Sequence, residues 1–451
     1  MSLRNLFTEN IILPLSDIAL GQSISKHFKF LQKSQWWSEN DLKEYQNEKL
    51  RILINHVYKN VPYYNDLFKK LRLTPTDIRN TDDLLKLPIL TKKDLRENFR
   101  NGEIINKNIH KKQLMFIGTS GSTGEPLQYY ITKDAYSFNI AANLRGWYWF
   151  GYRLGDKYTK LSIYHRDTFN KKIQDKFNNC VYVLFQDLTT SEIKSIVKQI
   201  RGSNSTVVRG NPSTLFIISD YISNNNILDI ELKAINTTGE ILFPNMRKAI
   251  ESNFHCPVFD SYSCEGGATA FECDTHKKYH IAAEYSFTEI ISKGERVSKS
   301  GKGEIVYTDL WNYAVPFIRY NSKDIAVISD SKCSCKRGLP VIDKIEGRNV
   351  DILVTPGGKR ITVHYFNVYF DCLDSISQFQ VIQYELDKIE LKLIPNNDLS
   401  NTEREKIYND ISSFIGNDVE FSIKIVDAIP IDPKNGKRRF VIRNKDIKFD
   451  L

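Results

Sequence analysis

One short segment concentrates groups that can bind phosphate. Residues 119–126, Thr-Ser-Gly-Ser-Thr-Gly-Glu-Pro, combine several hydroxyl groups with two glycines. Glycine lets the backbone approach a phosphate and adopt positive φ, so that N–H and hydroxyl groups donate to the phosphate oxygens. The segment lacks the spacing of a P-loop, and a flexible turn is the alternative. The candidate phosphate ligands are Thr119, Ser120, Gly121, Ser122, Thr123 and Gly124.

Two carboxylates follow apolar runs with strand character. Glu265 lies in segment 260–267, where a carboxylate can hold Mg²⁺ while a nucleotide supplies further oxygens. Asp324 ends segment 317–324 and could accept hydrogen bonds from two ribose hydroxyls. The structural alternatives are an ordinary surface glutamate at 265 and a salt-bridged turn between Arg319 and Asp324.

A basic loop near the C-terminus could bring a lysine to a phosphate. In residues 433–439, Pro-Lys-Asn-Gly-Lys-Arg-Arg, Gly436 permits a sharp turn that projects Lys437. A solvated surface loop is the alternative.

Helices and strands must position these groups. Residues 40–72 have helical apolar spacing with a new segment at Pro62, and Thr91 begins a capping box with Asp94. Residues 114–118 and 127–132 are expected strands on either side of the glycine–serine loop, and 132–150 an expected helix capped by Thr132. From about 155 to 330, short apolar strands alternate with helices, which predicts an α/β domain with parallel sheets.

The last hundred residues have a different pattern. A hairpin is expected over 347–361 with Gly357 and Gly358 at its turn, followed by two alternating strands, a helix near 402–415 and another strand. We therefore expect α/β architecture with a large domain over 1–350, helical over about 1–110, and a small α+β domain over 351–451. The boundary falls near Asp351.

Length and charge agree with a multidomain protein that binds anions. The chain has 451 residues and a net charge of +9, which fits two or three domains and anionic ligands such as nucleotides. No nucleic-acid-binding motif is present. No apolar stretch is long enough to span a membrane, so we expect a cytoplasmic protein without stable membrane insertion. Residues 10–20 are apolar but contain Pro14 and Asp17, which leaves a peripheral membrane contact open.

The order and spacing of these motifs resemble the adenylate-forming superfamily of acyl-CoA synthetases, peptide-synthetase adenylation domains and luciferases. More narrowly, the chain resembles the phenylacetate–CoA ligase branch, including relatives linked to capsular polysaccharide biosynthesis. The similarity covers nearly the whole chain. It includes LRILINHVYKNVPYYNDLF at 50–68, LPILTKKDLREN at 87–98, RGNPSTL at 209–215 and TTGEILFP at 237–244.

The resemblance implies a large domain that binds ATP and a mobile small domain. It implies that the loop from Thr119 to Gly124 holds the ATP phosphates, that Glu265 binds Mg²⁺ and that Asp324 holds the ribose. Asp351 matches the hinge, and Lys437 the lysine inserted during adenylation. The residues expected to border the adenine are Gly239, Glu240, Asp260, Ser261 and Tyr262, and Arg348 is expected beside the ribose. The chain departs from many relatives at Ser263, Cys264, Ser322 and Lys323, where Lys323 adds charge and bulk near the ribose.

A zinc site is also expected. Cys333 and Cys335 form a tight C-x-C pair, and Cys273 and His280 lie just after the magnesium segment. Three thiolates and one imidazole form a closed tetrahedral set typical of structural zinc. His276 competes for the fourth position, although the family pattern favours His280. Buried, reduced thiols are the alternative.

These observations predict an AMP-forming acid ligase. It would activate a carboxylic acid as acyl-AMP, release pyrophosphate and pass the acyl group to coenzyme A or an amine, with a role in capsule or other surface polysaccharide biosynthesis. The alternative is a non-catalytic nucleotide-binding or scaffold protein of such a system. Arg145, Arg209 and His165 could bind a polar substrate, and residues 147–149, Trp-Tyr-Trp, could line an aryl pocket or pack in the core. The acid, the acceptor and the oligomeric state stay open.

Overall fold

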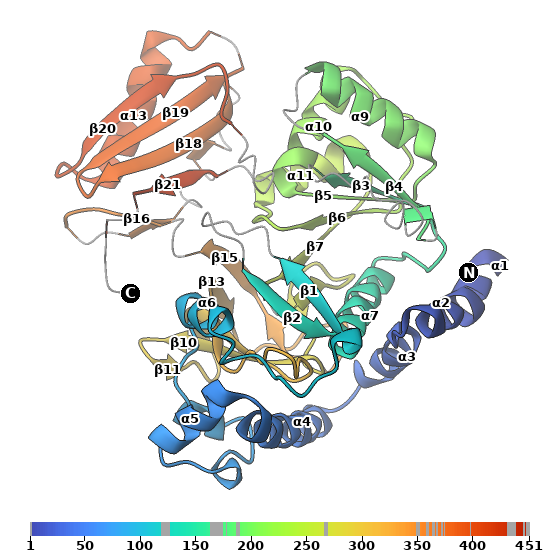
Figure 1. Ribbon diagram of the computed structural model, residues 1–451. Coiled ribbons are helices and arrows are strands. Elements are labelled where there is room, and N and C mark those ends of the chain that lie inside the picture. Colours follow the sequence, from blue (N-terminus) through green and yellow to red (C-terminus); the bar gives the residue numbers. More distant parts are fainter. Residues whose placement is uncertain are drawn as a thin grey trace.

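Helices form the N-terminal part of the chain, as the apolar spacing predicted. In the computed structural model (Figure 1), the predicted helix over 40–72 is two helices divided at Pro62, and Thr91 caps the next helix in a capping box with Asp94. The helices are α1 (Leu3–Phe7), a π turn (Thr8–Ile12), α2 (Leu13–Leu20), α3 (Ile24–Ser34), α4 (Glu39–Asn60), α5 (Pro62–Lys70) and α6 (Lys92–Arg100). Short 3-10 turns lie between α5 and α6, at Pro75–Asp77 and Asp83–Lys86, and after α6, at Lys111–Gln113.

The structure describes most of the chain. The described residues are 2–118, 127–162, 175–176, 178–185, 190–265, 269–348, 352–357, 360–362, 366, 369–370, 373, 375–396, 398–430, 439–444 and 447. No helix within these ranges is both long and apolar enough to cross a bilayer.

A hairpin and a long helix follow the N-terminal helices. Strands β1 (Leu114–Gly118) and β2 (Gln128–Thr132) pair in antiparallel register, with Gly118 opposite Gln128. Helix α7 (Lys133–Trp149) begins at Thr132, whose side chain accepts the N–H of Ala135. The predicted strands on both sides of the glycine–serine segment are therefore confirmed, and they place the two ends of that segment side by side.

An eight-stranded mixed sheet, with strand order β14-β9-β8-β7-β6-β5-β3-β4, confirms the α/β prediction. Strands β3 to β7 are parallel to one another, and β8, β9 and β14 continue the sheet in antiparallel pairings. The strands are β3 (Tyr158–Ser162), β4 (Cys180–Leu184), β5 (Val207–Gly210), β6 (Ala234–Thr238), β7 (Val258–Ser263), β8 (Thr269–Glu272), β9 (Tyr279–Ile281) and β14 (Val341–Ile342). The helices between them are α9 (Thr190–Ser203), α10 (Pro212–Asn224) and α11 (Pro244–Phe254).

A second, antiparallel sheet of five strands was not anticipated from the sequence. Its order is β11-β10-β12-β13-β15. The strands are β10 (Ser286–Ser292), β11 (Glu295–Arg296), β12 (Gly301–Asp309), β13 (Tyr320–Ile328) and β15 (Lys344–Arg348). Its strands are connected by turns rather than by helices, which is why alternation of helices and strands does not reveal it.

The C-terminal residues form a separate lobe at the upper left of Figure 1. The predicted hairpin is β16 (Ile352–Val354) and β17 (Arg360–Thr362), and the lobe has a four-stranded sheet of order β20-β19-β18-β21. Its other elements are β18 (Ile376–Glu385), β19 (Lys388–Pro395), α13 (Asn401–Ile415), β20 (Glu420–Ile425) and β21 (Val441–Arg443). The Phe440 ring packs against the ring of Phe243, which directly precedes the helix at Pro244–Phe254, and the two ring centroids are 5.8 Å apart.

A buried ion pair ties α7 to the chain between the two sheets. The guanidinium of Arg145 donates to Glu284 at 2.6 Å, and both side chains are fully buried. The hydroxyl of Ser34 in α3 donates to the same carboxylate oxygen at 2.6 Å. Because Arg145 is occupied in the core, the hypothesis that it binds a polar substrate is wrong.

This pair predicts a large stability effect. Replacement of Glu284 by alanine leaves the Arg145 charge buried without its carboxylate, and we expect the free energy of unfolding to fall by about 3–5 kcal/mol. Urea unfolding measures the change. The matched control is Asp229→Ala, which breaks the exposed Arg201–Asp229 pair and should cost about 1 kcal/mol or less. Equal losses in the two variants would contradict the prediction.

Candidate functional site

The two large sheets are joined by a tyrosine and an aspartate. Tyr262 lies near the end of β7 in the eight-stranded sheet, and Asp324 lies in β13 of the five-stranded sheet. The Tyr262 hydroxyl donates to Asp324 Oδ2 at 2.7 Å, although the two residues are 62 positions apart. The Asp324 N–H donates to Ser322 Oγ at 3.1 Å, within strand β13. The predicted ribose carboxylate therefore lies directly beside a residue predicted to border the adenine.

Glu265 lies just beyond β7, on the same side of the molecule as Asp324. Burial, and then the negative charges of Asp324 and Glu265, raise the pKa of the Cys264 thiol well above its usual range. Both carboxylates therefore lie near enough to this thiol to influence its protonation. The raised pKa also keeps Cys264 protonated at neutral pH, which makes it a poor nucleophile.

A lysine that the sequence interpretation missed contacts the predicted magnesium carboxylate. Lys92, the first residue of α6, places its Nζ 3.4 Å from Glu265 Oε1, and Glu265 is only 8% exposed. Lys92 lies in the segment at 87–98 that carries the family resemblance, but its side chain gives no signal of its own in a chain rich in lysine. The long-range contact appears only when α6 packs beside β13.

The side chains of Asp260 and Ser261 face protein groups. The Thr237 hydroxyl donates to Asp260 Oδ1 at 2.6 Å, and the Tyr279 hydroxyl donates to Oδ2 at 2.8 Å. Burial and the neighbouring Glu272 raise the pKa of Asp260 to about 6. Ser261 Oγ accepts from the Asn236 amide at 2.8 Å. These contacts hold the end of β7 in place.

Gly239 and Glu240 directly follow β6, the parallel neighbour of β7. Thr238 pairs with Ser261 in this register, so the ends of the two strands lie side by side. Gly239 adopts φ of +85°, a conformation that favours glycine. Glu240 accepts the N–H of Ser213 at 3.0 Å, at the first turn of α10. The structure therefore brings these predicted residues to the same edge of the sheet as Tyr262.

Several predicted residues lie outside the described residues. They are Thr119, Ser120, Gly121, Ser122, Thr123, Gly124, His165, Asp351 and Lys437. The strands that border two of these segments are described. The ends of β1 and β2 flank segment 119–126, and Arg348 pairs with Asp324 in the register of β15 with β13. Arg348 is thus placed beside the ribose candidate by its backbone.

The alternative of a salt-bridged turn between Arg319 and Asp324 is wrong. Arg319 donates to Glu289 at 3.2 Å and to the carbonyl oxygen of Leu87 at 2.6 Å. Lys323 has positive φ, and its Nζ lies 3.2 Å from Glu304 Oε2 at the surface. The expected charge of Lys323 near the ribose is therefore paired with a carboxylate of β12.

Aromatic residues of α7 pack in the core rather than line a pocket. Trp147 and Trp149 are buried, and the Trp149 indole N–H donates to Gln35 at 2.8 Å. Tyr148 donates its hydroxyl to Glu9 at 2.9 Å. The guanidinium of the half-buried Arg209 lies over the Trp147 ring, 5.3 Å from its centroid. The core-packing alternative therefore describes residues 147–149.

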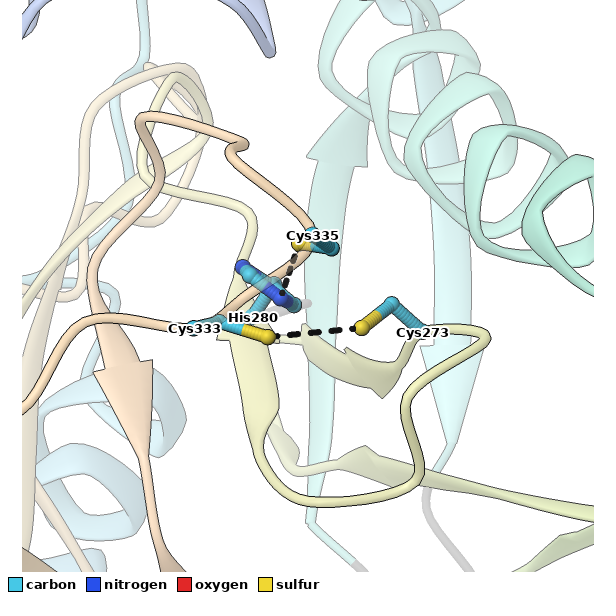
Figure 2. A group of neighbouring side chains, drawn as sticks. All are labelled: Cys273, His280, Cys333 and Cys335. Atoms are coloured by element: carbon cyan, nitrogen blue, oxygen red, sulfur yellow. Dashed lines mark hydrogen bonds between the residues drawn. The ribbon is translucent and has the colours of Figure 1, made fainter.

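A second cluster brings together Cys273, His280, Cys333 and Cys335 (Figure 2). Their ligand atoms all lie within 4.8 Å of one another, with 3.6 Å between Cys273 and Cys333 Sγ and 3.2 Å between Cys335 Sγ and His280 Nε2. Four ligands at about 2.1–2.3 Å from one metal ion would be separated by similar distances, whereas a disulfide requires about 2.05 Å. The donor set and spacing fit a tetrahedral zinc ion.

The other histidine candidate faces away from this cluster. His276 packs on the Phe259 ring with centroids 4.3 Å apart, and its Nδ1 lies 4.0 Å from Glu272. His280 lies in β9, opposite Val341. Burial and then the charges of Arg337 and Arg145 lower the pKa of His280 to about 4, so the imidazole is neutral, the form that binds a metal. The cluster connects the turn after β8 with the loop after β13.

The sequence relatives agree with the predicted family resemblance. The family model described as CapK C-terminal domain matches residues 353–444. The chain is 25% identical to Protein CapK of Staphylococcus aureus, over 95% of this chain and 94% of that protein. It is 27% identical to phenylacetate-coenzyme A ligase of Pseudomonas putida, over 71% of this chain and 73% of that protein. The predicted resemblance is thus confirmed, and at the level of homologues so is the predicted enzyme class.

The solved structures agree with the fold. A 2-hydroxyisobutyryl-CoA ligase in the postadenylation state, bound to R3-HIB-AMP, has a TM-score of 0.75 and 17% identity, over 92% of this chain and 93% of that one. The predicted adenylate-forming fold, a large α/β part followed by a C-terminal domain, is confirmed.

Proposed function

We propose that this protein uses ATP and Mg²⁺ to convert a carboxylic acid into its acyl-AMP, releases pyrophosphate, and then transfers the acyl group to an acceptor. The observation that carries the proposal is the contact of Tyr262 with Asp324 across the two sheets, with Glu265 three residues further along the chain and paired with Lys92. Distant parts of the chain thereby place two carboxylates at one edge, where the ends of β6 and β7 also lie. The acyl-CoA ligase homologues support the same reaction.

Different residues would have different roles in adenylation. Attack of a carboxylate on the α-phosphate brings two anions together, so positive charge and N–H donors must stabilise the transition state. The loop from Thr119 to Gly124 would hold the phosphates, and Asp324 the ribose. Glu265 would hold Mg²⁺, which neutralises phosphate charge when bound. Until then, Lys92 keeps the buried Glu265 carboxylate paired.

The C-terminal domain would complete the site. We place the domain boundary at Asp351, so that residues 351–451 turn as a unit and bring Lys437 to the phosphates. Rotation then withdraws the lysine and opens a path for the acceptor. The modest aromatic contact between Phe440 and Phe243 is compatible with such a motion. Coenzyme A is the acceptor favoured by the ligase homologues, and an amine is the alternative.

The cellular role is proposed from one relative. Likeness to Protein CapK over nearly the whole chain supports a part in capsule or other surface polysaccharide biosynthesis. The protein would work in the cytoplasm, where reduced thiols persist. Within it, Cys273, His280, Cys333 and Cys335 would hold one structural zinc ion that joins two loops, since four protein ligands leave no open position for catalysis.

The competing function is a nucleotide-binding scaffold without catalysis. Pyrophosphate release from ATP with a panel of carboxylic acids distinguishes the two. We expect release with at least one acid, and a decrease of roughly 10²–10³-fold in Lys437→Ala, because one charged donor to the transition state is lost. Lys406→Ala, at an exposed position of α13, is the matched control and should retain full activity. No release with any acid would favour the scaffold.

A further inference from the structure

The first helical segment of the chain exposes its apolar side. Leu3, Phe7, Ile11, Leu15 and Ile18 are 86%, 53%, 45%, 60% and 80% exposed. They recur every three or four residues, which places them along one side of the segment formed by α1, the π turn and α2. A π turn contains more residues per turn than an α turn, so the four-residue spacing stays on one side. A helix normally turns such a side toward the protein core.

The polar side of the segment is the one that contacts the protein. Asn5 is buried and donates to the Leu154 carbonyl oxygen at 2.8 Å and to Asp156 at 2.9 Å. Asp17 is also buried and accepts the N–H and the hydroxyl of Ser25 at 2.7 and 2.6 Å. These contacts fix the rotation of the helix, so its apolar side cannot turn inward without breaking them. The exposure is therefore a stable feature of the fold.

Positive charge lies along the same edge. Figure 1 shows α1, α2 and α3 following one another along one side of the molecule. Exposed Lys26, Lys29 and Lys33 lie on α3, and Trp36, which follows it, is 55% exposed.

The segment itself carries little negative charge. The first 36 residues contain only two acidic residues. One is Asp17, and the other is Glu9, which accepts a hydrogen bond from Tyr148. The edge thus combines apolar side chains, a tryptophan and three exposed lysines, and the exposed Asp134 of α7, which contacts Ser23 and His27, borders it.

We propose that this N-terminal edge, residues 2–36, binds an anionic lipid surface. An amphipathic helix with leucine, isoleucine and phenylalanine on one side enters the boundary between headgroups and acyl chains, and basic residues add attraction to acidic lipids. Tryptophan favours the same interface. The charge of the edge selects a negatively charged bilayer over a neutral one or over a second copy of the same positive edge. The helix lies on the membrane and does not span it.

Vesicle binding tests the proposal. The purified full-length protein should sediment with vesicles of phosphatidylglycerol and phosphatidylcholine, and much less with phosphatidylcholine alone. Leu15→Glu combined with Ile18→Glu should lower the partition coefficient by roughly tenfold or more, because two apolar anchors become charged. Replacement of Lys26, Lys29 and Lys33 by glutamine should lower it by about fivefold per lysine and reduce its salt dependence.

The control makes the same kind of substitution at an exposed leucine outside the N-terminal edge. Leu228, beyond α10, is 74% exposed, and Leu228→Glu should bind vesicles like the parent. Circular dichroism of each variant verifies that it is folded. Equal binding to both vesicle types, or binding unchanged in the Leu15/Ile18 variant, would overturn the proposal. So would a dimer in light scattering that the Leu15/Ile18 variant abolishes, because a second copy would then cover the apolar side.

Discussion

Glu265→Gln is expected to lower acid-dependent pyrophosphate release by roughly 10²–10³-fold without unfolding the protein. Glutamine keeps the shape of a side chain that is only 8% exposed, but it removes the charge that would bind Mg²⁺. The magnesium concentration that gives half-maximal activity should rise at the same time. Initial rates measured over a magnesium titration provide both values.

An exposed glutamate of the same region supplies a control for the loss of a negative charge alone. Glu97 lies on the same helix as Lys92, and its carboxylate is 3.9 Å from Lys93 in an exposed pair. Glu97→Gln should leave both the rate and the magnesium titration unchanged. If Glu265→Gln behaved like Glu97→Gln, the assignment of Glu265 as the magnesium carboxylate would be wrong.

Cys273→Ser is expected to release the zinc ion and to destabilise the protein. Elemental analysis should give about one zinc per chain for the parent and none for the variant. We expect the free energy of unfolding to fall by at least about 3 kcal/mol, because a structural zinc contributes its binding energy to folding. Chelation should lower the melting temperature of the parent and leave that of the variant unchanged.

Two further substitutions separate the metal from simple packing. Cys256 is buried but lies outside the cluster, so Cys256→Ala should retain zinc and its sensitivity to chelation. His276→Ala should also retain zinc, because that ring packs on Phe259. A parent protein that is folded and equally stable without zinc would contradict the site.

Local signals in the sequence were sufficient to locate most helices and strands, but not to identify which side chains contact each other between them. Pro62, the capping box at Thr91 and the cap at Thr132 located helix starts, since each is a contact within a few residues. The same kind of signal could not reveal that Lys92 reaches Glu265, or that Arg319 pairs with Glu289 rather than with Asp324. Those pairs depend on how helices and sheets pack.

The fourth member of the cysteine–histidine cluster is a second case in which local spacing alone could not identify the contact. Spacing from Cys273 allowed either His276 or His280, because both follow within one short turn and strand. Pairing of β9 with β14 brings His280 near the loop that carries Cys333 and Cys335. The N-terminal segment was recognised as apolar, but its outward orientation depends on the buried contacts of Asn5 and Asp17.

The pairing of β13 with β15 has a mechanical consequence. Asp324 lies opposite Arg348 in the register of the two strands, and only residues 349–351 separate Arg348 from the first strand of the C-terminal lobe. A nucleotide bound to Asp324 would therefore restrict the motion of β15, the strand that leads into that lobe. Nucleotide binding at Asp324 and the proposed rotation of the lobe would therefore be coupled through the backbone pairing of β13 with β15 rather than through a series of side-chain contacts.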